Sequence, residues 1–274
     1  MIQGPASLPD LPVLQRARGE GRVTVASDGR RTRLQRLYQE GCANIRLPAS
    51  DGAEAVLINT AGGLTGGDRL SWSAEVAEGA ALTLTSQACE KVYRARDGVA
   101  EVAVRLEVRE QGRLDWLPQE TILFDGGAIS RRLEADLAPG ARLLATEAVV
   151  LGRSAMGETV RRGLLRDRWR IRQEGRLIFA DDLRLEGAVA DLAGRAPLLD
   201  GARAFASILV VDGEAGRLLA PLRALLGPGG GASAFDGKLF ARVAAPDGLA
   251  LRRVLLPALE LLRDGRPLPR VWRT

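Results

Sequence analysis

The sequence predicts a mainly β fold with a helical C-terminal end. Apolar and polar residues alternate with a period of two over much of residues 80–140, which is typical of strands with one buried face. A short glycine-containing turn motif recurs before strand-like runs, and leucines near the C-terminus take helical spacing. With 274 residues and 46% apolar content, the chain is long enough for a sizeable core, and we expect one domain over residues 1–274 with a flexible segment at 1–20.

The first elements in chain order are short. Val23 and Val25 alternate with polar residues, as a short strand would, before a turn at Ser27 to Gly29. The period of residues 33–48 is ambiguous. Residues 55–59 form a short apolar run that is typical of a buried strand.

That strand leads into the most specific stretch of the chain, Gly62 to Asp68, which holds four glycines and one acid in seven residues. Glycine is used where the backbone takes a positive φ or approaches another group closely. A phosphate-binding loop is excluded, because Asp68 stands where such a loop has its lysine. Two interpretations remain: a tight structural loop, or a loop that directs the Asp68 carboxylate into a cavity.

After the loop, strands and turns alternate. The strands are indicated by apolar residues two apart, namely Leu82, Leu84, Val102, Val104, Leu106 and Val108, and by Ile129, Leu133 and Leu137 in the same phase. The turn motifs carry Gly79, Gly112, Gly140, Gly175 and Gly216, at irregular spacings of 28 to 41 residues. This recurrence fits strands that wind through successive layers of a β-solenoid, and it fits ordinary hairpins in a β-sandwich equally well.

The C-terminal part changes character. Leucines between Leu218 and Leu226 have helical spacing, and the glycine-rich run at 227–231 ends that helix. A strand is expected at 238–243, followed by a second amphipathic helix from Val254 to Leu262. Two helices against many strands favour a mainly β fold with a helical end.

Composition excludes several classes of function. The chain has no histidine, which excludes Ser-His-Asp and Cys-His catalysis and the usual histidine-containing metal sites. Cys42 and Cys89 lie too far apart in sequence to suggest a zinc motif or a disulfide framework. The net charge of +5 comes from dispersed arginines, so we expect no nucleic-acid binding. No signal peptide or membrane span is indicated, and we expect a cytoplasmic protein with no membrane partner.

Five motifs in register resemble the UreD (UreH) family of urease accessory proteins. The resemblance runs from about residue 30 to the end of the chain, and its motifs are Gly62 to Asp68, Thr85 to Arg94, Trp116 to Asp125, Leu151 to Glu158 and Pro269 to Trp272. It implies a largely right-handed β-helical structure with a few helices and no enzymatic activity. It also implies a chaperone that inserts nickel into urease through an internal tunnel. The implied partners are the urease apoprotein, the helical accessory protein UreF and the GTPase UreG, with a homodimer allowed within the complex.

Given this resemblance, carboxylates are the candidate ligands of a transient nickel path, with no tightly bound cofactor. Oxygen ligands hold nickel weakly and exchange it quickly, which suits a conduit. The candidate acids are Asp68, Glu120, Glu147, Glu158 and Asp181, and the candidate polar lining is Thr85, Ser86 and Gln87. Glu120 and Glu147 stand out because each interrupts a strongly apolar stretch, where a charged acid must be paired or face a metal.

Several of these candidates have a structural alternative. Glu120 would form a salt bridge to an arginine, Glu158 would pair with Arg153, and Thr85 to Gln87 would be a hydrogen-bonded strand end. Whether Asp181 or Asp182 corresponds to the family's acid stays open. For the whole chain, the alternatives are a carboxylate-based carbohydrate enzyme on a β-solenoid, which needs two acids in an open cleft, and a purely structural scaffold with every acid paired.

Overall fold

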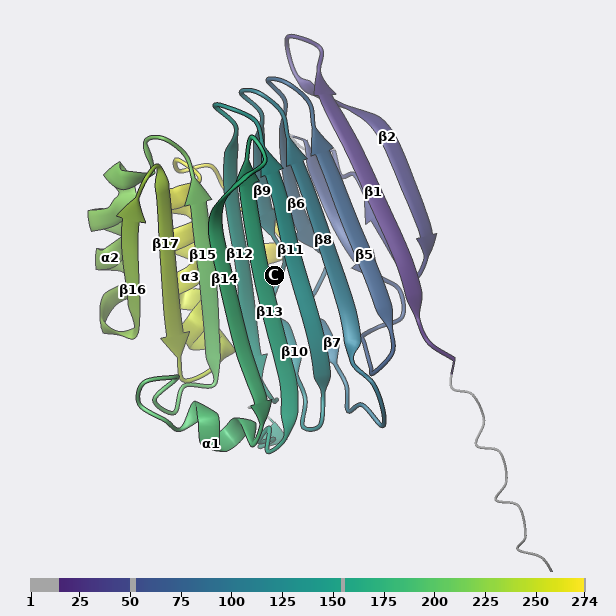
Figure 1. The fold of residues 1–274 in the computed structure, drawn as a ribbon, viewed down its shortest axis with the longest axis vertical. Coiled ribbons are helices and arrows are strands. Elements are labelled where there is room, and N and C mark those ends of the chain that lie inside the picture. The colour runs from purple at the N-terminus through teal and green to yellow at the C-terminus, as the bar shows by residue number, and fades with distance from the viewer. Residues whose placement is uncertain (1–14, 50–52, 154–155, 274) are drawn as a thin grey trace, which may run out of the picture.

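The protein is a β-solenoid of about four turns, with helices mostly near its C-terminal end (Figure 1). The computed structural model describes residues 15–49, 53–153 and 156–273. The first 14 residues of the expected flexible N-terminal segment lie outside the described residues, and the first strand begins at Arg18.

Two large sheets form the two walls of the solenoid. The first, called sheet A, has the order β14-β13-β11-β8-β5-β1-β2, and the second, sheet B, has the order β16-β17-β15-β12-β9-β6-β4-β3. Sheet A is built from β1 (Arg18–Ser27), β2 (Thr32–Gly41), β5 (Arg69–Val76), β8 (Ala100–Val108), β11 (Ala128–Leu137), β13 (Gly163–Gln173) and β14 (Arg176–Gly187). Sheet B is built from β3 (Ala43–Arg46), β4 (Glu54–Asn59), β6 (Ala81–Ser86), β9 (Arg113–Leu117), β12 (Arg142–Leu151), β15 (Ala204–Val211), β16 (Gly230–Phe235) and β17 (Lys238–Ala245). The short strands β7 (Glu90–Val92) and β10 (Thr121–Leu123) pair with each other, and β10 also pairs with β12.

Parallel pairing decides between the two folds that the turn motifs allowed. The central strands of sheet A pair in parallel, and so do β4, β6, β9 and β12 of sheet B. Hairpins of a sandwich would pair antiparallel, so the recurrence reflects solenoid turns. Inward-facing residues stack from turn to turn, as in the ladder Trp72, Val104, Leu133 and Trp169.

Three of the five predicted turn motifs form equivalent corners between the sheets. Gly79, Gly112 and Gly140 each connect a strand of sheet A to the next strand of sheet B, and backbone hydrogen bonds join neighbouring corners, as from Arg142 N to Gly112 O (2.9 Å). Gly175 instead lies in the antiparallel β13–β14 hairpin, and Gly216 lies in the 3-10 helix η2 (Ala215–Leu218).

Both predicted C-terminal helices are present. They are α2 (Leu219–Leu226) and α3 (Gly248–Leu262), and α3 starts earlier than expected because the Asp247 side chain caps its first turn. A third helix, α1 (Val189–Ala193), was not predicted. Two further 3-10 turns are η3 (Gly227–Gly229) and η4 (Arg270–Trp272). Helix α3 contacts β12, β15 and β17, so it covers the outer face of sheet B (Figure 1).

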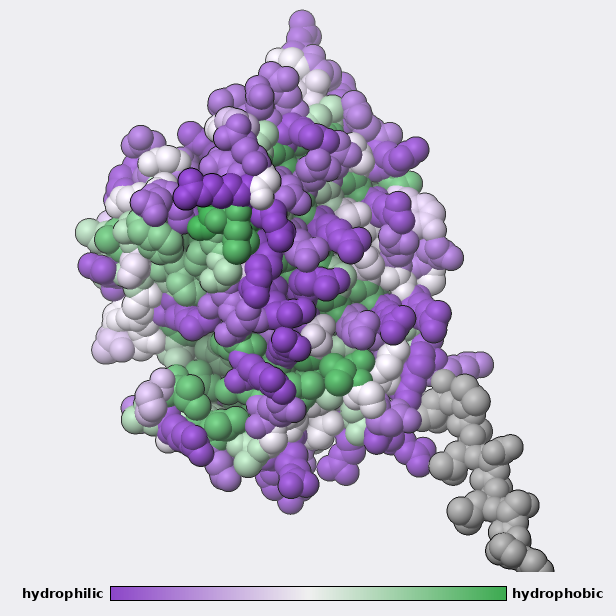
Figure 2. Space-filling model, in the orientation of Figure 1, coloured by the Kyte–Doolittle hydropathy of each residue, from purple (hydrophilic) through white to green (hydrophobic). Residues whose placement is uncertain are grey.

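Buried apolar residues form three clusters. One fills the interior between the sheets around Leu82, Leu114 and Leu143, and a second lies between sheet B and the helices. A third lies around Leu123, Val149 and Leu165. In the view of Figure 2 the surface over sheet A is largely hydrophilic, as the alternation of its strands requires. Within the described ranges, no helix is long and apolar enough to cross a membrane.

Candidate functional site

A cavity of about 200 Å³ lies inside the solenoid, between the two sheets. Sheet A contributes Trp72, Val104 and Arg131 to its wall, and sheet B contributes Trp116 and Glu147. Its remaining lining is Leu57, Ile58, Asn59, Gly62, Leu70, Ser86, Gln87, Ala88, Cys89, Glu90, Lys91, Val102, Pro118, Gln119, Thr121 and Ile129. Because Gly62, Gln87, Ala88 and Lys91 are exposed, they mark the side on which the cavity meets solvent.

Glu147, on β12, lines the inner part of this cavity and is 2% exposed. Its Oε1 accepts a hydrogen bond from Trp116 Nε1 (2.9 Å). Its Oε2 lies 2.5 Å from Arg131 Nη1, but it accepts no hydrogen bond of good geometry from the described residues. This oxygen is held by an ion pair with Arg131, and its remaining lone pair can accept a further donor from the cavity.

The Arg131 guanidinium is committed mainly to another acid. It donates to both oxygens of Asp167, from Nε (3.2 Å) and Nη2 (2.6 Å), and also to the Thr121 hydroxyl (3.0 Å). The buried cluster of Arg131, Glu147 and Asp167 thus contains one cation and two carboxyls. Burial raises the pKa of Glu147 to about 7, with the Asp167 charge adding to the shift and the Arg131 cation opposing it.

Glu90 is a second cavity acid, and the sequence analysis did not single it out. Burial raises the pKa of Glu90 to about 7, while the Asn59 amide, 3.1 and 3.2 Å from its two oxygens, opposes the shift. Its burial comes from β4 and from the pairing of β7 with β10, which are distant in sequence. The sequence carries no signal of that pairing. Glu147 and Glu90 are the described acids that line this cavity.

The predicted polar lining is divided between two faces of sheet B. Ser86 and Gln87 line the cavity, and they also hold Gln119, whose backbone N–H donates to Ser86 Oγ (2.9 Å) and whose side chain donates to Gln87 O (3.1 Å). Thr85 does not line the cavity. Its hydroxyl accepts from Trp272 Nε1 (3.2 Å), beneath the C-terminal segment.

Glu120 takes the structural alternative, a salt bridge. It is 2% exposed, and Arg252 of α3 donates to both its oxygens, from Nε (2.6 Å) and Nη2 (3.0 Å). Burial acts to raise the pKa of Glu120, but the Arg252 hydrogen bonds outweigh it and hold this pKa below its usual value. Glu120 is thus a charged partner of α3, beside the cavity but not in its wall.

Asp68 ties the glycine loop to the start of the first strand. It is 4% exposed, and its two oxygens accept from Ala17 N and Thr65 N, both at 2.8 Å. Of the loop glycines, Gly63 and Gly66 are required by close packing, since a Cβ would lie 2.4 Å from the Tyr93 ring or 2.0 Å from Asp97 O. Gly62 and Gly67 have positive φ, and Gly62 lines the cavity mouth. The Asp68 carboxylate itself is not among the lining groups.

The last two candidate acids are ion-paired at the periphery. Glu158 accepts from Arg153 Nε (2.8 Å), which lowers the pKa of Glu158, so the predicted Arg153–Glu158 pair is present. Asp181 pairs with Arg242 (2.6 Å), and Asp182 pairs with Arg170. The structure therefore places Glu147, Ser86 and Gln87 together and leaves the other predicted acids apart from them.

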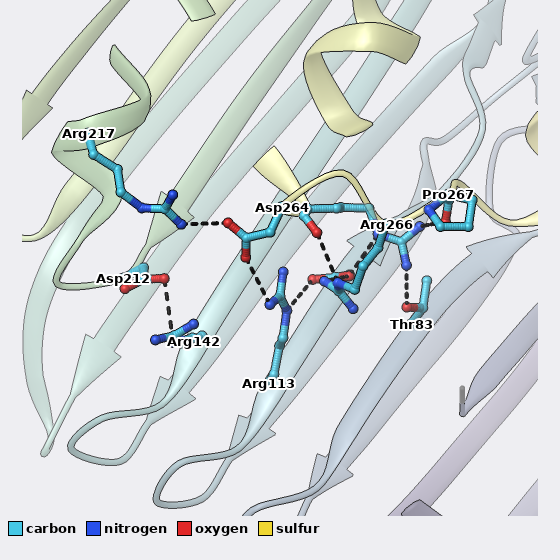
Figure 3. A network of polar contacts seen from close by, with 10 residues as sticks. Thr83, Arg113, Arg142, Asp212, Arg217, Asp264, Arg266 and Pro267 are labelled. Carbon is cyan, nitrogen blue, oxygen red and sulfur yellow. Dashed lines mark hydrogen bonds and ion pairs between the residues drawn. The ribbon is translucent and has the colours of Figure 1, made fainter. Parts of the chain in front are cut away.

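A separate polar network anchors the end of α3 to sheet B (Figure 3). Asp115, 1% exposed, accepts from Arg263 and Arg266 (both 3.1 Å), and Arg263 also donates to Thr83 Oγ1 (3.1 Å). Asp264 pairs with Arg217 (2.5 Å). Asp115 and Asp264 are each ion-paired with arginine, which stabilises the docking of the helix, and Asp115 Oδ1, like Glu147 Oε2, accepts no hydrogen bond of good geometry from the described residues.

This cavity does not have the geometry of an open cleft with two acids. Across residues 15–49, 53–153 and 156–273, no three His, Cys, Asp or Glu side chains are grouped to hold a metal ion. The cavity is smaller than the roughly 300–1,000 Å³ typical of sites for small organic ligands, so a sugar chain does not fit it. One carboxyl that is ion-paired with Arg131 and one that is hydrogen-bonded to the Asn59 amide suit brief contact with a small cation more than lasting retention.

The family model and the individual relatives that match this chain indicate the same family. The family model described as UreD urease accessory protein matches residues 17–273. The urease accessory protein UreD of Rhizobium leguminosarum bv. viciae is 54% identical over 261 residues, covering 94% of this chain and 96% of its own. That of Agrobacterium fabrum is 52% identical over 260 residues, covering 94% and 92%. That of Sinorhizobium medicae is 54% identical over 266 residues, covering 94% and 96%.

Proposed function

This chain belongs to the UreD family of urease accessory proteins and so has a role in urease maturation, and we propose that it relays nickel through the cavity between its sheets. Nickel is the cargo of this step, not a resident cofactor. The observation that carries the proposal is the pair of cavity carboxyls, the partly buried Glu90 beside the mouth and the buried Glu147 further in, both with a pKa raised to about 7.

A carboxyl poised in this way favours transfer over retention. Near neutral pH it is readily deprotonated by an arriving cation and reprotonated when the cation leaves. Its neighbours in the wall include the Ser86 and Thr121 hydroxyls, whose oxygens would bind nickel weakly. No histidine exists in the chain to trap the ion.

The role in urease maturation implies association with urease and with other accessory proteins. We propose, more specifically, the urease apoprotein, the helical protein UreF and the GTPase UreG as partners, in the cytoplasm. The exposed leucines Leu225 on α2 and Leu249 on α3 support a contact of UreF with this helical end. The double variant Leu225→Glu/Leu249→Glu is expected to lose co-elution with UreF, and retained co-elution would exclude this surface.

The relay is tested by co-expressing urease and its accessory proteins with Glu147→Gln or Glu90→Gln. Glutamine keeps the side-chain shape and the contact with Trp116 or Asn59, but it cannot take up charge. We expect a loss of about tenfold or more in the rate of nickel incorporation, measured from urease nickel content and urea hydrolysis. Glu78→Gln, at an exposed turn, is the matched control.

The outcome separates the relay from a structural scaffold. If both cavity variants activate urease as fast as the control while the accessory complex forms normally, the carboxyls carry no nickel. The chain would then act as a scaffold alone. If activation falls and co-purification with the accessory proteins is unchanged, assembly and relay are distinct properties of the chain.

A further inference from the structure

Helix α3 reaches the mouth of the cavity through one side chain, Arg252. Its Nη2 donates to Gln119 Oε1 (2.8 Å), in addition to the two hydrogen bonds that Nε and Nη2 make to Glu120. Gln119 and Glu120 are both at least nine-tenths buried. One guanidinium therefore fixes two consecutive residues, with the bidentate geometry that arginine forms with a carboxylate.

These two residues in turn fix the mouth segment, Ser86 to Glu90. Besides the two hydrogen bonds from Gln119 described above, Glu120 O accepts from Glu90 N (2.9 Å). Glu120 Oε2 also accepts from the Cys89 thiol (3.3 Å). The segment is thus attached to Gln119 and Glu120 along its whole length, and it carries exposed mouth residues and one of the two cavity carboxyls.

The C-terminal turn η4 packs against the outer side of Arg252 and the mouth segment. The Arg252 guanidinium lies 5.5 Å from the centroid of the Trp272 ring, within the range of a cation–π contact. Trp272 Nε1 donates to Thr85 Oγ1 and to Leu117 O (3.1 Å), next to the mouth segment and the strand before Gln119. Helix, C-terminal turn and cavity mouth therefore meet at Arg252.

We propose that Arg252 is the positioning residue of the cavity mouth: by holding Gln119 and Glu120 it fixes Ser86 to Glu90 and so sets access to the cavity. The effect on cargo rests on the proposed nickel relay, whereas the effect on access does not. Releasing Arg252 should loosen the mouth segment locally and expose Cys89, while the solenoid turns stay folded.

Cys89 supplies a direct measure of access. It lines the cavity, is partly buried and donates to Glu120 Oε2, so we expect its thiol to react slowly while the mouth is fixed. In a full-length Cys42→Ser parent, we expect Arg252→Ala and Arg252→Lys to speed the reaction of Cys89 with an aromatic disulfide reagent by at least about tenfold. Lysine keeps the charge but cannot form the fork. Arg253→Ala, at the exposed neighbouring position of α3, should leave the rate unchanged.

Cys42 separates local release from general loosening. In a Cys89→Ser parent, the reaction rate of Cys42, which lies between β2 and β3, should be the same with arginine or lysine at position 252. Unchanged Cys89 reactivity in folded Arg252→Lys, or equal acceleration of both cysteines, overturns the positioning role. If Arg252→Ala does not fold, the Cys89 reaction rate in Arg252→Lys alone tests the positioning role. The assay needs neither nickel nor partners. A negative result in it would therefore not contradict the proposed nickel relay, and a negative result for the relay would not contradict the positioning role of Arg252.

Discussion

The two ends of the space between the sheets are built differently. At the corners that carry Gly79, Gly112 and Gly140, the interior is dry, with Leu82, Leu114 and Leu143 between 0 and 2% exposed. At the other end the same sheets enclose Glu90, Glu147 and Arg131 around a cavity. The same strands therefore line an apolar core at one end and the polar cavity a few residues away at the other.

The corner geometry explains the difference. At the dry end each turn passes from sheet A to sheet B through a short stacked corner, so apolar residues stay in register from turn to turn. At the other end the chain returns through longer connections that include only three-residue strands, β7 and β10. Irregular backbone there leaves space that polar side chains occupy. Apolar packing and, under the proposed relay, cargo handling therefore lie at different ends of the same strands.

Replacing Arg131 should have the largest effect on stability. Arg131→Met leaves Asp167 and Glu147 buried without their cation, and breaking a buried ion pair costs about 3–5 kcal/mol. Urea unfolding measures the loss, with Arg132→Met as control, because Arg132 is partly exposed on the outer face of the same strand. A loss below about 1 kcal/mol would mean that the polar end contributes little to folding and is only a chamber.

Leu114→Ala tests the dry end. It removes a fully buried side chain from the stacked layer and should cost about 3 kcal/mol in the free energy of unfolding. Leu177→Ala, at a half-exposed position, is the control. Nickel incorporation per folded molecule should be unchanged in Leu114→Ala. A selective loss of incorporation would show that the two ends are coupled and do not act independently.

The dry end could be predicted from sequence, and the polar end only in part, since Glu147, Ser86 and Gln87 were candidates and Glu90 was not. Period-two runs such as Val102 to Val108 fix which side chains face inward, whatever the strand pairs with. Glu120 and Glu147 look alike in sequence, since both interrupt apolar stretches. They differ because Arg252, 132 positions from Glu120, pairs with one, while Arg131 is shared between the other and Asp167. That difference arises only from tertiary contacts, as does the burial of Glu90.

The pH dependence of stability should report the cavity acid Glu90. Its folded pKa, raised to about 7, exceeds the ordinary glutamate value, so the folded state binds more protons than the unfolded state between about pH 4.5 and 7. Its contribution is therefore complete below pH 4.5 and is lost as pH rises to about 7. Glu90→Gln should reduce the fall in unfolding free energy between pH 5 and 8 by on the order of 2 kcal/mol. The control is Glu78→Gln, and an unchanged pH profile in Glu90→Gln would place the carboxyl in water.

The smallest effects compare single glycines at the two ends. Gly79 at a dry corner and Gly62 at the cavity mouth have φ of 63° and 76°, and a Cβ on either would meet no atom within 4 Å. Alanine should therefore cost each about 1 kcal/mol through backbone strain alone. Thermal unfolding measures both, and Gly63→Ala should cost more because its Cβ would overlap the Tyr93 ring. If Gly62→Ala costs much less than Gly79→Ala, the mouth loop relaxes where the corner does not. The two ends of the solenoid interior would then differ in backbone rigidity as well as in polarity.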